Sequence, residues 1–287
     1  MNRVLPYLGI DVTHIDNSHD GPTATRIHGR LTRLLPGAHV SPTVPTAHDI
    51  ELALTLVDKA DAVANTWLRV GSPLNPGEIT HAVLSNIAVR RGSNNHCVQF
   101  GYLFFRNLLI VTTWGGRELS LLKKVIHQET AVQFFQIPAV LAWAVNRGLI
   151  TKEHAKHINE SQFRTYDFGP FAVKWLLDGL HTGHDPLPSE DLPWSEVPSV
   201  GCGIVAQIDS HGNVKTTGLD RGQWPKMSEV KDGKHSFIRG SSGLDELRFI
   251  ELIIKGARAA DYYKLSVGQE VPRRVEQNVH LNSRRQS

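Results

Sequence analysis

Carboxylates at turns are the side chains of this chain best suited to do chemistry. Asp16, Asp20, Asp167 and Asp209 all lie in sequence that favours turns. A carboxylate directly after a strand can accept two hydrogen bonds from a ribose diol, or it can pair with a cationic ligand. The structural alternative is a helix N-cap or an Asx turn, which is the commoner role of an isolated Asp at such a place.

Residues 205–217 give the most distinctive local pattern. Apolar residues on both sides flank the sequence Ser-His-Gly-Asn, which favours a tight turn. The pattern predicts a hairpin in which Asp209 ends one strand and Asn213 starts the next. These two polar groups would then point at one spot, as a binding site requires.

Histidine spacing offers a weaker candidate, a metal site. His154 and His157 are three residues apart on a predicted helix, and His181 and His184 repeat that spacing. Zinc sites need further ligands, and neither pair has the spacing and internal Glu of an H-E-x-x-H motif. We therefore interpret these histidines as surface or core residues and predict no metal site. The glycines at 201 and 203 lack the third glycine of a dinucleotide fingerprint and precede their strand, so that motif fails as well.

Strands and helices alternate in the first third of the chain, which predicts an α/β layer architecture with parallel strands. The predicted strands are residues 12–15, 40–44 and 67–70, and the predicted helices are 24–35 and 49–64. Loops after such strands are where open α/β sheets bind ligands. Further along, the predicted strands are 86–90, 99–105 and 108–113, and the predicted helices are 118–127, 130–149 (interrupted by Pro138) and 171–180.

A proline-rich stretch marks the best domain boundary. Residues 186–200 contain four prolines, and mostly strand-forming sequence follows them. We predict an α/β nucleoside-binding domain over 1–185, a linker over 186–200 and a smaller β domain over 201–272. The remaining residues, 273–287, read as a polar basic tail.

Composition excludes several function classes. The chain has 287 residues, 40% of them hydrophobic and 21% charged, and its formal net charge is +3. Its basic residues are scattered, so we expect no nucleic-acid partner. Neither cysteine, Cys97 or Cys202, belongs to a CxxC pair, which favours free thiols in a reducing compartment. No apolar signal core or spanning run is present, so we predict a cytoplasmic protein without a membrane partner.

Four segments together resemble one known family. The first is a hairpin at 204–216 with the pattern hydrophobic–Asp–x–x–Gly–Asn–hydrophobic–x–Thr, and the second is a final strand and helix at 250–268 that ends in a hydrophobic–x–x–Gly–x–x–Val pattern. The third is a first strand ending in Asp16 with Gly29 and Pro36 after it, and the fourth is a turn at 111–116. This set is similar to the S-adenosylmethionine hydroxide adenosyltransferase family, which also contains the fluorinase and chlorinase that make 5′-halo-adenosines. The similarity covers most of residues 12–271.

The resemblance implies a fold, an assembly and a reaction. It implies an N-terminal α/β domain with a C-terminal β-barrel-like domain, assembled as a homotrimer with the site between two subunits. A nucleophile attacks C5′ of S-adenosylmethionine, the substrate, and displaces methionine, with no further cofactor. Asp16, together with Asp20 in the same loop, would bind the ribose end, and Asp209 would face the methionine ammonium with Asn213 in support.

The chain departs from the family where the nucleophile is held. Asn75 stands in place of an Asp in the family's D-P-G-V-G loop, and Arg164 stands in place of a His. We therefore predict a remodelled catalytic set of Asn75, Arg164, Thr165 and Asp167, with hydroxide as the default nucleophile. Two alternatives stay open: a related enzyme with another nucleophile or another 5′-substituted adenosine, and a relative that binds S-adenosylmethionine without turnover. A metal hydrolase is a distant third.

Overall fold

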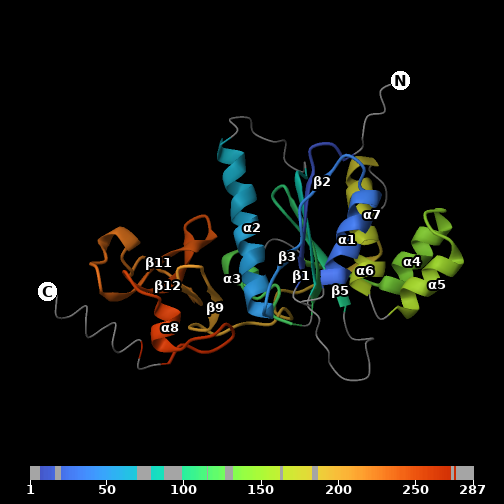
Figure 1. Ribbon diagram of the computed structural model, residues 1–287. Coiled ribbons are helices and arrows are strands. Elements are labelled where there is room, and N and C mark those ends of the chain that lie inside the picture. The colour runs from blue at the N-terminus through green and yellow to red at the C-terminus, as the bar shows by residue number, and fades with distance from the viewer. Residues whose placement is uncertain are drawn as a thin grey trace.

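The computed structural model describes residues 7–16, 21–69, 79–86, 99–114, 116–126, 132–161, 164–182, 187–272 and 275. A mixed, mostly parallel eight-stranded sheet is covered by helices, and a separate four-stranded antiparallel sheet follows it in the chain (Figure 1). The prediction of an α/β domain followed by a smaller β domain is confirmed at this level. Within the described ranges, no helix has both the length and the apolar character that crossing a bilayer requires.

The large sheet has the strand order β2-β1-β4-β6-β5-β7-β8, and β3 also pairs with β1. Its strands are β1 (Asp11–Asp16), β2 (His39–Val40), β3 (Val44–Pro45), β4 (His81–Asn86), β5 (Gln99–Phe105), β6 (Leu108–Trp114), β7 (Val132–Phe135) and β8 (Ser189–Leu192). Strand β1 is parallel to β2, β3 and β4, and β4 is parallel to β6. Strands β5, β7 and β8 complete the sheet in antiparallel fashion.

The chain reverses its direction of travel across the sheet at β1. Helix α1 (Gly21–Leu34) leads from β1 to β2 on one side, whereas α2 (Asp49–Arg69) leads from β3 to β4 on the other side. The two helices cover opposite faces, because Ile27 of α1 packs with Val12 and Leu84, while Leu56 of α2 packs with Ile15. Open α/β sheets bind ligands at such a switch point, outside the carboxyl ends of the strands.

The remaining helices of the first domain complete these two layers. They are α3 (Leu122–Val125), α4 (Ile137–Asn146), α5 (Lys152–Glu160), α6 (Arg164–Asp167) and α7 (Gly169–Thr182). Helices α6 and α7 lie against α1, and α3 lies against α2. Helices α4 and α5 form a pair at the outer end of the domain (Figure 1).

The second domain packs on the outer side of α2. Its strands follow the order β11-β12-β10-β9, and they are β9 (Val205–Ile208), β10 (Val214–Leu219), β11 (His235–Leu244) and β12 (Leu247–Ile254), with α8 (Ala259–Tyr263) after them. Ala206, Leu244 and Phe249 belong to the same buried core as α2. Helix α2 therefore lies between two sheets (Figure 1).

Polar contacts add direction to this interface. Asp61 of α2 accepts a hydrogen bond from Arg248 Nη1 at 2.9 Å, and Asp58 accepts one from Ser242 Oγ at 3.0 Å. Lys215 Nζ also lies 4.0 Å from the Asp58 carboxylate. Because these contacts combine with a shared apolar core, the two domains form one packed body.

Several sequence predictions of local structure differ from the structure. The helix expected at 118–127 is limited to α3, and β4 ends at Asn86, where the strand expected at 86–90 was to begin. The strand expected at 67–70 is wrong up to Arg69, because α2 continues to that residue and β4 fills the place beside β1. Residues 130–149 contain strand β7 and then α4, and Pro138 lies in the first turn of α4, where a missing N–H costs nothing. The stretch expected to be a linker, 186–200, also contributes the edge strand β8.

Candidate functional site

A row of polar side chains crosses three neighbouring parallel strands at their carboxyl ends. Asp16 is paired with Asn86 in the register of β1 and β4. Ser85 is paired with Thr112 between β4 and β6, so Asn86 and Thr113 continue the same row. Residues at one register position of a parallel sheet share a face, and neighbouring strands are about 4.8 Å apart. The row therefore spans about 10 Å on the α1 side of the switch point.

Asp16 is fixed firmly at this edge. Its side chain is buried, with the residue only 4% exposed, and its main-chain carbonyl accepts a hydrogen bond from Thr46 N at 2.9 Å. Residue 45 of β3 pairs with Asp16 on one side, and Asn86 of β4 pairs on the other. A carboxylate anchored at the switch point is well placed to accept hydrogen bonds from ligand hydroxyls.

His14 lies behind Asp16 on the same face of β1. It is fully buried, and its Nδ1 is 3.1 Å from Thr43 Oγ1. Burial lowers the pKa of His14 to about 4, although the nearby Asp16 carboxylate partly opposes that shift. Because His14 is neutral at physiological pH, it does not cancel the charge of Asp16, and the row keeps its attraction for cations and hydroxyl donors.

Glu118 extends the row beyond β6. Its carboxylate Oε1 accepts a hydrogen bond from Thr113 Oγ1 at 3.1 Å. Glu118, Asn86 and Thr113 were not among the site residues predicted from the sequence. Thr113 ends a predicted strand, but Asn86 begins one and Glu118 begins a predicted helix, so no common position in the sequence marks the three residues. Their shared place depends on strand pairing that the sequence does not display.

The predicted pair Asp209 and Asn213 is brought together. Asp209 accepts hydrogen bonds from the backbone N–H groups of His211 and Asn213, at 2.8 and 2.9 Å, and from Asn213 Nδ2 at 2.9 Å. Partial burial acts to raise the pKa of Asp209, but these hydrogen bonds outweigh it and hold the pKa below its usual value. Asp209 is therefore an ionised carboxylate in a turn at the end of β9.

Gly212 gives this turn its shape. Its φ of +78° favours glycine, and a Cβ at this position would come within 2.6 Å of Arg258 Cβ. Arg258 Nη1 in turn donates a hydrogen bond to Ser210 O at 2.7 Å. The turn is thus held against the segment that leads into α8.

Asp167 and Thr165 lie in a different environment, between α1 and α6. Arg30 Nη1 contacts the Asp167 carboxylate at 3.1 Å, and Ser161 Oγ donates to its other oxygen. The Arg30 guanidinium also lies 3.7 Å from the centroid of the Tyr166 ring. Asp167 is thus part of a buried ion pair between helices, and Thr165 is buried beside it.

The other predicted site residues are placed less fully. Asn75 and Asp20 lie outside the described residues, and the backbone of Arg164 begins α6. Of the candidate metal ligands, His154 packs its ring against Phe171 and His157 lies 3.8 Å from the Asp167 carboxylate. Across the described part of the chain, no three His, Cys, Asp or Glu side chains gather as a metal centre would require.

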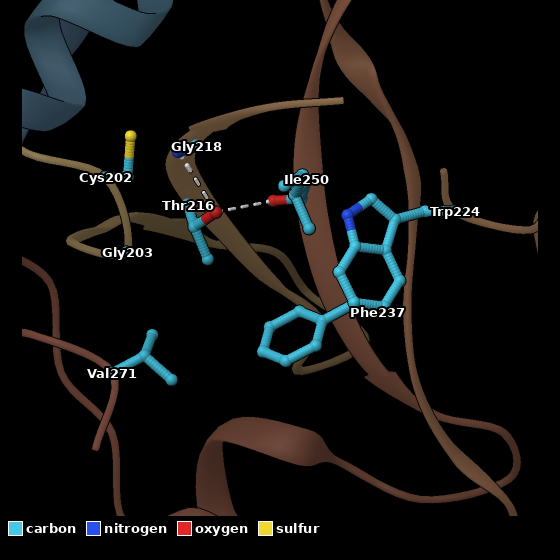
Figure 2. Close-up of a pocket in the computed structure, with 8 residues that line it drawn as sticks. All are labelled: Cys202, Gly203, Thr216, Gly218, Trp224, Phe237, Ile250 and Val271. Carbon is cyan, nitrogen blue, oxygen red and sulfur yellow. Dashed lines mark hydrogen bonds between the residues drawn. The ribbon is translucent and has the colours of Figure 1, made fainter. Parts of the chain in front are cut away.

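A separate cavity of about 270 Å³ lies in the second domain, on the face of its sheet that points away from α2 (Figure 2). It is lined by Cys202, Gly203, Thr216, Gly218, Trp224, Phe237, Ile250 and Val271. The Thr216 hydroxyl donates to Ile250 O at 2.9 Å and accepts from Gly218 N at 3.4 Å, so it is already engaged. The cavity thus offers mainly apolar walls.

Comparison with known proteins bears on the fold. No family model and no curated protein matches the sequence. The structure is similar to that of an uncharacterized conserved protein from Thermotoga maritima, with a TM-score of 0.54 and 14% sequence identity, over 90% of this chain and 97% of that chain. The whole two-domain arrangement, and not one domain alone, is therefore shared with a solved structure.

Proposed function

We propose that this protein binds S-adenosylmethionine at the carboxyl edge of its large sheet and displaces methionine from C5′ with water, which yields adenosine. The observation that carries the proposal is the position of Asp16, a buried carboxylate at the end of β1, beside the point where the chain reverses across the sheet. A ribose diol offers two hydroxyl donors to such a group.

The length of the row suits an extended nucleoside. Asp16 and Thr113 lie about 10 Å apart across three strands, which leaves room for a ribose and its 5′ substituent. The two ends of the row also differ, as the two ends of such a substrate do. Asp16 lies at one end, and the hydrogen-bonded pair of Thr113 and Glu118 lies at the other. We assign the ribose to the Asp16 end and the reacting C5′ to the middle of the row.

The second acidic site supports an assembly of several copies. Gly268 N donates to Val205 O, and Gly268 packs closely on His48, which follows β3 near Asp16. The start of β9 therefore faces the edge that carries Asp16, whereas Asp209 lies beyond the other end of β9, about 13 Å further along. We infer that Asp209 and Asn213 complete the site of a neighbouring copy, in a homotrimer as the family resemblance implies, with Asp209 facing the methionine ammonium.

The chemistry asks little acid catalysis of the protein. Sulfur leaves from a sulfonium as a neutral thioether, so the leaving group needs no proton. The protein has to hold the nucleophile, C5′ and sulfur in line and keep bulk water out, and such positioning is worth several orders of magnitude in rate. Three members of the catalytic set predicted from the sequence, Asn75, Arg164 and Thr165, are proposed to orient the water.

The test is to incubate the purified protein with S-adenosylmethionine and to detect adenosine and methionine by mass spectrometry. Equal release of the two products, together with a raised melting temperature in the presence of substrate, is the expected result. A raised melting temperature without products would select the non-catalytic binding alternative. Neither products nor a shift would refute the proposal.

A further inference from the structure

A buried carboxyl group lies at the end of the site row, in the segment that follows β6. Glu118 is only 1% exposed, and its Oε1 is held by the Thr113 hydroxyl. Its other oxygen, Oε2, is buried and makes no hydrogen bond of good geometry to a described residue, although the backbone N–H groups of Gly116 and Glu118 lie close to the carboxylate. A buried acceptor left unpaired is costly, so its presence calls for an explanation beyond folding.

The local backbone keeps space for this carboxylate. A Cβ at position 116 would lie 2.9 Å from Glu118 Oε2 and 3.1 Å from Oε1, so only glycine leaves the group undisturbed. Thr113 at the end of β6 fixes the carboxylate from the other side. The group is thus positioned by β6, one of the three strands that carry the row.

The charges around Glu118 come from its own segment and from the start of α2. Asp49 of α2 lies near it, and Asp49 is itself paired with Arg117 Nε at 2.9 Å and with His48. Burial raises the pKa of Glu118 to about 7, and the Asp49 charge adds to that shift, while the Thr113 hydrogen bond and nearby amide groups oppose it. A carboxyl group with such a pKa can gain and lose a proton near neutral pH.

We infer that Glu118 is the general base that accepts the proton of the attacking water. The inference rests on the proposed function. As the water oxygen forms its bond to C5′, the C5′–S bond breaks and its electron pair leaves with methionine sulfur. The water O–H bond breaks at the same stage, and its proton passes to Glu118 and later to solvent, so the products are adenosine, methionine and one proton.

The catalytic set predicted from the sequence offers no better-placed base. Asn75 occupies the place where the resembled family carries a carboxylate, and an amide does not accept a proton at neutral pH. Asp167 is already bound by Arg30 and Ser161. Among the residues that the structure describes, Glu118 is the acidic group that combines burial, an oxygen without a well-formed hydrogen bond and a direct link to the row.

The test compares Glu118→Gln with Glu251→Gln, a matched change at another buried glutamate in β12, which is 6% exposed. Substrate binding is measured by calorimetry and adenosine release by mass spectrometry, from about pH 5 to pH 9. E118Q should bind S-adenosylmethionine within about threefold of wild type but lose roughly 100-fold or more in turnover. The rise of wild-type turnover with pH, centred near 7, should also disappear, and E251Q should behave like wild type.

The possible results separate the role of Glu118 from the proposed function on which it rests. Active wild type with E118Q turnover within about threefold of it, or with the same pH profile, would overturn the base assignment and leave the proposed function standing. Wild type that releases no adenosine would overturn both. If E118Q does not fold, Thr113→Val decides, because loss of the opposing hydrogen bond should move the midpoint of the pH profile upward, and an unmoved midpoint would refute the role.

Discussion

Subunits that lack Asp16 and subunits that lack Asp209 should restore each other's activity when they assemble together. The reason is the geometry of one chain, in which Asp16 lies at the sheet edge that faces the start of β9 and Asp209 lies beyond the end of β9. If the two carboxylates serve one substrate, they come from two copies. Asp16→Asn and Asp209→Asn then damage different halves of the same site.

The size of the Asp16→Asn effect follows from the hydrogen bonds that Asp16 would accept from the substrate. Hydrogen bonds to a charged group contribute about 1.5–3 kcal/mol each, and Asp16 would accept two from a ribose diol. Asp16→Asn should therefore lose about 3 kcal/mol or more, which is at least roughly 100-fold in kcat/KM. Asp11→Asn, at the other end of β1 and half exposed, is the matched control and should stay near wild type.

The assay is adenosine release by co-expressed mixtures. With random assembly of equal amounts, a site has an intact Asp16 half the time and an intact Asp209 half the time, so about one quarter of wild-type activity should return. Each variant alone stays near 1%, and so do two variants mixed after separate assembly. A co-assembled mixture that remains near 1% would show that each site is built within one chain and would refute the geometric reasoning.

Three further predictions concern folding and charge. Phe249→Ala, in the core shared with α2, should lower the free energy of unfolding by about 3–5 kcal/mol. Circular dichroism and tryptophan fluorescence should still show a single urea transition for both domains, and separate transitions would contradict a shared core. Folding raises the pKa of Glu118 from 4.5 to about 7, so the stability that this group contributes is complete below pH 4.5 and is lost as pH rises through 7. In denaturant titrations, the free energy of unfolding of wild type relative to E118Q should therefore fall by about 3 kcal/mol between pH 4 and pH 8. Gly212→Ala should lower the melting temperature more than Gly222→Ala, because both positions have positive φ but only the first meets Arg258; equal shifts would exclude that contact as the cause.

The fold was predictable where periodicity was strong and local. The apolar spacing in α1 and α2 and the strands β5 and β6 emerged from the sequence, because each pattern reports one buried face. The prediction for residues 132–135 was wrong for the opposite reason, since the short segment Val-Gln-Phe-Phe before Pro138 is equally compatible with the start of a helix. Only pairing with β5 and β8 decides that it is a strand.

The candidate site was predictable in part for the same reason. Asp16 follows an apolar strand directly, so its place at a sheet edge is a local property, and the turn that joins Asp209 to Asn213 is local as well. Glu118 could not be predicted from the sequence, because its neighbours resemble the start of a helix, where acidic residues are common. Its burial depends on the return of the chain beneath α2, which no local pattern records.

The apolar residues of helix α2 connect the fold to the proposed site. Leu52 and Leu54 lie about 160° apart around the helix, yet both are buried, and the same core reaches from Ile15 in the large sheet to Phe249 in the small one. A helix apolar on nearly opposite sides must be covered on both, so the second domain is bound to α2 by an obligate interface. Because that interface holds the second domain beside α2, Asp209 stays beyond the end of β9 that is farther from the edge carrying Asp16. The packing of one helix therefore favours a site completed by a second copy.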